Sequence, residues 1–156
     1  MVGLAVSVAL VVPVVASFGL SPLPATAATD SKALIKDLEA TRAKLDPIPG
    51  LIQNQEWDQV RTILKTPPVN FLWNMGDSKN PVQVLAQLTD ELDLIEAKDE
   101  IAISLQMCDQ LVYDNVFLPY QPGNGKIKIK EPNDLAIQAM KQIDDAIQLA
   151  KAAVGS

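Results

Sequence analysis

Apolar residues recur at helical spacing along most of the chain from residue 30 onward, which predicts a protein built from α-helices. Asp30 and Ser31 can cap the first of these helices. Its apolar face consists of Leu34, Ile35, Leu38 and Leu45. Prolines and a glycine within residues 47–50 disturb the pattern, and we expect residues 51–52 to resume the helix briefly.

The segment EWDQVRTILKTPPVNFLW, residues 56–73, carries a second predicted helix and both tryptophans of the chain. The apolar stripe of this helix consists of Trp57, Val60, Ile63 and Leu64. Pro67 and Pro68 should break or kink it, because a proline inside a helix lacks the N–H donor. Pro68 can also begin a renewed helical turn over residues 69–73, since the first turn of a helix does not need that donor.

A third helix is predicted to begin at Pro81, with Asn80 as its cap. No glycine or proline follows before residue 119, so this helix should span residues 81–117, a length of about 55 Å. Because such a length is large for a small bundle, the sequence leaves open whether the helix is continuous or bends near residues 97–98. The stripe expected to face the core consists of Val84, Leu85, Leu88, Leu92, Ile95, Ile101, Leu105, Cys108 and Val112.

The last helix is predicted over residues 132–154. Its inward face consists of Leu135, Ala139, Ile143, Ile147, Ala150 and Val154. Four helices with short connections favour an antiparallel, up-down-up-down arrangement. The predicted fold is therefore an all-α, up-down-up-down four-helix bundle with a short extended loop before the last helix.

The first 28 residues differ from the rest of the chain because they carry no charged side chain. Residues 2–20 are largely apolar, and residues 25–27, Ala-Thr-Ala, give the small-x-small pattern of a signal-peptidase site. We predict that residues 1–28 are a targeting leader that is removed, and that residues 29–156 form the helical domain. The alternative is a retained membrane helix, against which the proline at position 13 argues.

Composition excludes several classes of function. The formal net charge of −6 disfavours nucleic acid as a partner. The absence of histidine removes His-based catalytic triads, haem ligation by histidine and most catalytic zinc sites. Cys108 lies on an apolar stripe and is expected to be a buried, inert thiol. None of the carboxylate clusters has the spacing of a calcium-binding loop, so we expect no enzyme activity, no cofactor and no metal site.

The aromatic residues after the leader are few, and an antiparallel bundle would gather them at its two ends. Trp57, at the start of the second helix, should lie near Tyr113, Phe117 and Tyr120, whereas Trp73 should lie with Phe71 near Val82 and Leu85. These rings can simply close the ends of the bundle. Tryptophan and tyrosine also dominate interface hot spots. The candidate anchors for a partner are Trp57, Trp73, Tyr113 and Tyr120.

The sequence GKIKIKEP, residues 125–132, concentrates positive charge in an acidic chain. In an extended segment, side chains alternate between two sides. Lys126, Lys128 and Lys130 would then face outward, while Ile127 and Ile129 pin the segment to the bundle. The segment is either a solubilising edge or a surface that docks on an acidic partner.

Three parts of the chain resemble one known family. The segment of residues 56–73, the acidic helix after Asn80-Pro81, and VFLPYQPGNGKIKIKEP before the last helix are similar to extrinsic photosystem II subunits of the PsbQ type, with the closest resemblance to the additional extrinsic subunit of diatoms. The resemblance implies a four-helix bundle in the chloroplast thylakoid lumen. It implies a protein without activity of its own that docks on the photosystem II core and other extrinsic subunits, peripheral to the membrane. Such proteins help to stabilise the manganese cluster and retain calcium and chloride.

Two other classes remain open. One is a secreted helical inhibitor, although that class relies on disulfides and the chain has a single cysteine. The other is a small-molecule carrier, which would need an apolar cavity in its core.

Overall fold

The computed structural model describes residues 25–120 and 125–155, and within these ranges the chain is helical and contains no strand. The α-helices are α1 (Ala25–Ala43), α2 (Ile48–Gln53), α3 (Trp57–Lys65), α4 (Pro81–Thr89), α5 (Asp93–Phe117) and α6 (Lys130–Gly155). Short 3-10 helices, η1 (Val69–Leu72), η2 (Asp77–Lys79) and η3 (Leu118–Tyr120), connect some of them. The prediction of an all-α protein is confirmed.

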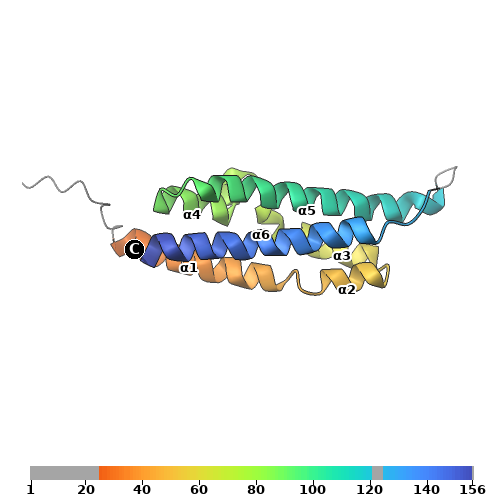
Figure 1. Cartoon of the computed structure of the whole chain (residues 1–156), viewed down its shortest axis with the longest axis horizontal. Helices are drawn as coiled ribbons and strands as arrows, with labels where there is room; N and C mark the ends of the chain where they lie inside the picture. The colour runs from red at the N-terminus through yellow and green to blue at the C-terminus, as the bar shows by residue number, and fades with distance from the viewer. Residues whose placement is uncertain (1–24, 121–124, 156) are drawn as a thin grey trace, which may run out of the picture.

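The helices form an elongated assembly in which α5 and α6 lie side by side along most of their length (Figure 1). Helices α1 and α2 follow one another along a neighbouring edge, whereas α4 and α5 are antiparallel, so that Asp77, just before α4, forms an ion pair with Lys98 of α5. The core is almost entirely aliphatic, with Leu38, Ile52, Leu64, Leu85, Ile101 and Ile143 fully buried. Buried alanines on α6 allow close approach of its neighbours: Ala136, Ala139, Ala146 and Ala150.

Most predicted apolar faces point inward as expected. Residues 51–52 belong to the short helix α2, and Pro68 directly precedes the 3-10 turn η1. Asn80 caps α4, because its Oδ1 accepts a hydrogen bond of 3.0 Å from the backbone N–H of Val82. The last helix begins at Lys130, two residues earlier than predicted.

The first helix begins earlier than the cap at Asp30 and Ser31 predicted. Helix α1 starts at Ala25, and Ser31 is buried inside it, where its hydroxyl donates a 2.7 Å hydrogen bond to the carbonyl oxygen of Ala27. A serine can bond the carbonyl four residues back without ending the helix. The leader predicted over residues 1–28 lies outside the described residues, apart from the first turn of α1.

The helix predicted over residues 81–117, whose continuity the sequence left open, is interrupted at residues 90–92, and α5 continues through residues 97–98. The chain breaks at Asp90, whose φ of +53° lies in the left-handed region and ends α4. Aspartate tolerates this conformation better than most residues, so it can occupy a helix C-terminus where glycine is usual. The chain turns back at this break, so that Lys98 of α5 forms an ion pair with Asp77, which precedes α4. Leu92, predicted to face the core, is 70% exposed at the turn, whereas Leu94 is fully buried.

Leu94→Ala should lower the free energy of unfolding by about 2–5 kcal/mol, because the truncation leaves a cavity in a packed core. Leu92→Ala should change it by less than about 0.5 kcal/mol, as expected for an exposed site. Urea unfolding of the two variants, followed by circular dichroism, measures both values. A loss at Leu92 as large as that at Leu94 would contradict the break at Asp90.

Cys108 is a buried thiol, as predicted, and its S–H group donates to the carbonyl oxygen of Pro132 at 3.4 Å. Burial raises the pKa of Cys108 to about 12, and the neighbouring charge of Asp109 adds to the effect. The folded protein therefore holds this proton more tightly than the unfolded chain. By linkage, the contribution of Cys108 to stability is present below pH 9 and is lost as the pH rises toward 12.

We expect Cys108 to react with a disulfide reagent at pH 8 far more slowly in the folded protein than in the denatured chain. The raised pKa leaves roughly 1,000-fold less thiolate, since each pKa unit is a factor of ten, and burial blocks access as well. Absorbance of the released thiol, with and without guanidinium chloride, gives the two rates. Similar rates would show that the thiol is exposed.

Candidate docking surface

A buried asparagine holds the lysine-rich segment against the helices. Asn115, on α5, donates a 2.7 Å hydrogen bond from Nδ2 to the carbonyl oxygen of Lys128 and accepts one of 2.8 Å at Oδ1 from the N–H of Lys128. The side-chain amide thus pairs with the backbone of residue 128 as a neighbouring strand would. We call this pair of hydrogen bonds the clamp at Asn115. Sequence reasoning missed Asn115, although its spacing from Cys108 and Val112 places it on the buried face of α5.

The two isoleucines of this segment do not share one role. Ile129 is half-buried and packs against the core, as predicted. Ile127 is 46% exposed, so the prediction that it pins the segment to the bundle is wrong. The clamp at Asn115 makes a second apolar pin unnecessary, and Ile127 is left facing an open cavity.

The three lysines also divide into two kinds. Lys126 and Lys128 are exposed in the extended residues 125–129, and neither forms an ion pair within the described part of the chain. Lys130 instead begins α6 and pairs with Asp134, whose carboxylate raises the pKa of Lys130. The predicted extended face of three lysines is therefore shortened to two, because the extended segment ends at Ile129.

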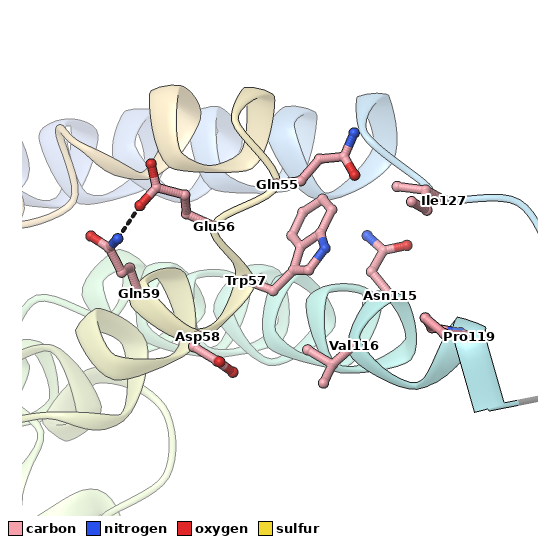
Figure 2. Close-up of a pocket in the computed structure, with 9 residues that line it drawn as sticks. All are labelled: Gln55, Glu56, Trp57, Asp58, Gln59, Asn115, Val116, Pro119 and Ile127. Atoms are coloured by element: carbon pink, nitrogen blue, oxygen red, sulfur yellow. Dashed lines mark hydrogen bonds between the residues drawn. The ribbon is translucent and has the colours of Figure 1, made fainter.

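Next to this segment lies an open cavity of about 470 Å³, which we call the Trp57 cavity (Figure 2). Its lining consists of Gln55, Glu56, Trp57, Asp58, Gln59, Asn115, Val116, Pro119 and Ile127. Gln55, with a φ of +58°, turns the chain out of α2 so that α3 begins at Trp57. The Trp57 ring extends into the space between Gln55, Asn115 and Val116, as Figure 2 shows. This places the start of α3 beside the end of α5, as predicted.

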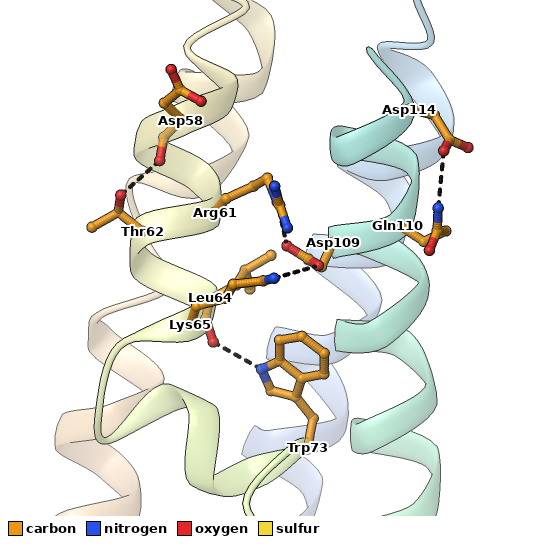
Figure 3. Close-up of polar contacts among 9 residues, drawn as sticks. All are labelled: Asp58, Arg61, Thr62, Leu64, Lys65, Trp73, Asp109, Gln110 and Asp114. Carbon is orange, nitrogen blue, oxygen red and sulfur yellow. Dashed lines mark hydrogen bonds and ion pairs between the residues drawn. The ribbon is translucent and has the colours of Figure 1, made fainter. Parts of the chain in front are cut away.

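The two tryptophans differ in how their polar atoms are used. The indole N–H of Trp73 donates a 2.8 Å hydrogen bond to the carbonyl oxygen of Leu64 near the end of α3 (Figure 3). Trp73 therefore stabilises a helix end that would otherwise leave a carbonyl without a partner. Within the described residues, no hydrogen bond is formed by the indole N–H of Trp57. Trp57 is thus the tryptophan with a donor available to another molecule.

A polar cluster of Arg61, Lys65 and Asp109 lies between α3 and α5 (Figure 3), and the Tyr113 ring packs against it. Asp109, whose side chain is only 12% exposed, accepts a 3.0 Å hydrogen bond from Nε of Arg61, and Nζ of Lys65 lies 3.7 Å away. The Arg61 guanidinium lies 4.6 Å from the centre of the Tyr113 ring, a cation–π arrangement. The centres of the Tyr113 and Phe117 rings are 4.6 Å apart. The side chain of Tyr120, the fourth candidate anchor, lies outside the described residues.

The described residues contain no group of three or more potential metal-binding side chains. No helix in the described part of the chain is long and apolar enough to cross a membrane. Comparison with known proteins finds no matching family model, no matching curated protein and no matching solved structure. What the surface can do must therefore be argued from its own geometry.

Asn115→Ala should lower the free energy of unfolding by about 1–3 kcal/mol, because it leaves the backbone groups of residue 128 without their partner. The matched control is Gln106→Ala, at an exposed position of the same helix, which should change stability by less than about 0.5 kcal/mol. Urea unfolding measures the loss, and hydrogen exchange of the Lys128 amide should become faster in Asn115→Ala only. Equal behaviour of the two variants would show that the clamp does not hold the segment.

Proposed function

We propose that this protein is an extrinsic, non-enzymatic subunit of photosystem II, located on the lumenal side of the chloroplast thylakoid membrane. It docks on the photosystem II core and neighbouring extrinsic subunits, peripheral to the membrane, through the surface that contains Lys126 and Lys128. Its role is to help stabilise the manganese cluster and to retain calcium and chloride there. The chemistry is that of the photosystem, and this chain supplies binding and shielding.

The observation that carries the proposal is a fixed pair of cations on an acidic protein. Lys126 and Lys128 remain without ion-pair partners in the described chain, although the protein has a net charge of −6. The clamp at Asn115 reduces the conformational entropy that the segment would lose on binding. Such a surface favours an acidic partner and association that is strong at low salt. The resemblance of residues 56–73 and 116–132 to PsbQ-type subunits selects photosystem II as that partner.

The proposed bundle topology is compatible with the order of the helices. We propose four legs: α1 with α2, then α3 with η1 and α4, then α5, and finally α6. Successive legs run in opposite directions: the breaks at residues 44–47 and 66–68 interrupt legs, whereas the turn at Asp90 begins a new one, since Asp77 before α4 pairs with Lys98 of α5. This grouping gives the up-down-up-down bundle that the family resemblance implies.

Changing Lys126, Lys128 and Lys130 together to glutamine should weaken rebinding to salt-washed photosystem II particles several-fold, because polarity is kept while the charge is lost. The salt dependence should also become flatter, since the Debye length falls from about 10 Å at 0.1 M to about 3 Å at 1 M. Sedimentation of the particles with bound protein measures both effects.

The matched control changes three exposed lysines of the α1 region, Lys32, Lys36 and Lys44, to glutamine. It alters the net charge by the same amount but leaves the proposed surface intact, so rebinding should follow the unchanged protein. If the two triple variants lose the same affinity, net charge and not this surface governs binding. If the unchanged protein does not rebind at any salt concentration, the proposed function is wrong.

A further inference from the structure

We propose that the Trp57 cavity receives one apolar side chain from an acidic segment of the partner, while Lys126 and Lys128 pair with carboxylates that flank that side chain. The inference rests on the proposed function for the identity of the partner, but its chemistry can be tested without it. It assigns an anchoring site to a surface that otherwise offers only charge.

The shape and lining of the cavity suit an apolar anchor. The volume of about 470 Å³ falls within the range of small-ligand sites, about 300–1,000 Å³. The Trp57 ring, Val116, Pro119 and Ile127 supply apolar surface from three separate segments. A half-buried tryptophan beside an exposed isoleucine is a typical centre for an interface, because burying both on binding removes apolar area from water.

The position of Ile127 joins the cavity to the positive charge. Ile127 forms part of the cavity lining, and the residues on either side of it are Lys126 and Lys128. Hydrogen bonds from Asn115 fix the backbone at residue 128, so the isoleucine and the lysines are presented together. Side chains of an extended segment alternate between its two sides, so the two ammonium groups would reach the neighbours of an apolar side chain at Ile127 through their long, flexible stems.

Carboxylates also lie around the cavity, so the preference for an acidic segment rests on Lys126 and Lys128. Glu56 and Asp58 also line the cavity, but Figure 2 shows both carboxylates directed away from the Trp57 ring, and Glu56 accepts a hydrogen bond from Gln59. A neighbouring hollow is lined by Asp114 together with Lys126 and Lys128, and Asp114 accepts a 2.9 Å hydrogen bond from Gln110.

The indole N–H of Trp57 adds a directional contact to this site. In the described structure it has no acceptor, whereas the side chain of Asn115 is already engaged with the backbone of residue 128. A backbone carbonyl of an extended partner segment can accept from this donor. Tryptophan is effective at interfaces because it combines a large apolar ring with one polar atom. The contact would fix the orientation of a segment whose apolar side chain enters the cavity.

The test uses three capped five-residue peptides and the ¹⁵N-labelled protein. The first has a central leucine with two aspartates on each side, the second replaces the leucine with serine, and the third replaces the aspartates with lysines. Two-dimensional NMR resolves one indole N–H signal for each of the two tryptophans. The leucine–aspartate peptide should shift the Trp57 indole signal and the amide signals of residues 126–128, and leave the Trp73 indole signal unchanged.

Matched variants separate the cavity from general apolar binding. Ile127→Ser removes part of the cavity lining from an exposed, extended position, so the fold should be retained. Ile137→Ser changes an isoleucine of similar exposure on α6, away from the cavity lining. The affinity for the leucine–aspartate peptide should fall at least fivefold in Ile127→Ser and stay unchanged in Ile137→Ser.

Several results would overturn the inference. These are no shift of the Trp57 signal at millimolar peptide, equal binding of the serine peptide, tighter binding of the lysine peptide, or equal affinities of the two isoleucine variants.

Rebinding to photosystem II particles distinguishes failure of the cavity inference from failure of the proposed function. If the peptide binds as expected but the protein does not rebind to the particles, the cavity inference stands and the proposed function fails. If rebinding depends on the lysines but the peptide shifts nothing, only the cavity inference fails.

Discussion

The surface that we propose for docking depends on the two hydrogen bonds between the Asn115 amide and the backbone of Lys128. Residues 125–129 form no helix or strand, so they have no regular ladder of their own to hold them. The buried Asn115 side chain on α5 supplies the missing partners for residue 128. Losing it would leave these part-buried backbone groups without a protein partner. The positions of Ile127 and of both flanking lysines follow from this single contact.

Similar residues serve different purposes in different parts of the molecule. Trp73 and the Arg61–Asp109 pair are engaged inside the protein, where they join η1 and α5 to α3. Trp57 opens toward a cavity, with its N–H free of a partner in the described chain. An aliphatic core can supply the packing without aromatic side chains. The rings are consequently available for helix ends and for surfaces, and their surroundings decide which role each one takes.

Periodicity predicted the inward faces of α1, α3 and α6 well, because a helical stripe depends mainly on local spacing. It failed at Asp90, where a non-glycine residue adopts a left-handed conformation and the chain turns back, so Leu92 lies outside and Leu94 inside. Of the candidate site, the charge of residues 126 and 128 was visible in the sequence. The role of Asn115 and the exposure of Ile127 were not visible. They depend on tertiary structure, because a side chain of α5 pairs with a loop 13 residues later.

Cross-linking inside photosystem II particles tests the central claim most directly, because it reports which lysines lie against carboxylates of a partner. A zero-length carbodiimide reagent joins only amines and carboxylates that are already paired, and mass spectrometry identifies the residues. The account predicts cross-links from Lys126 or Lys128 to acidic residues of photosystem II subunits, lost at high salt. Cross-links from Lys32, Lys36 or Lys44 of the α1 region, with none from Lys126 or Lys128, would contradict it.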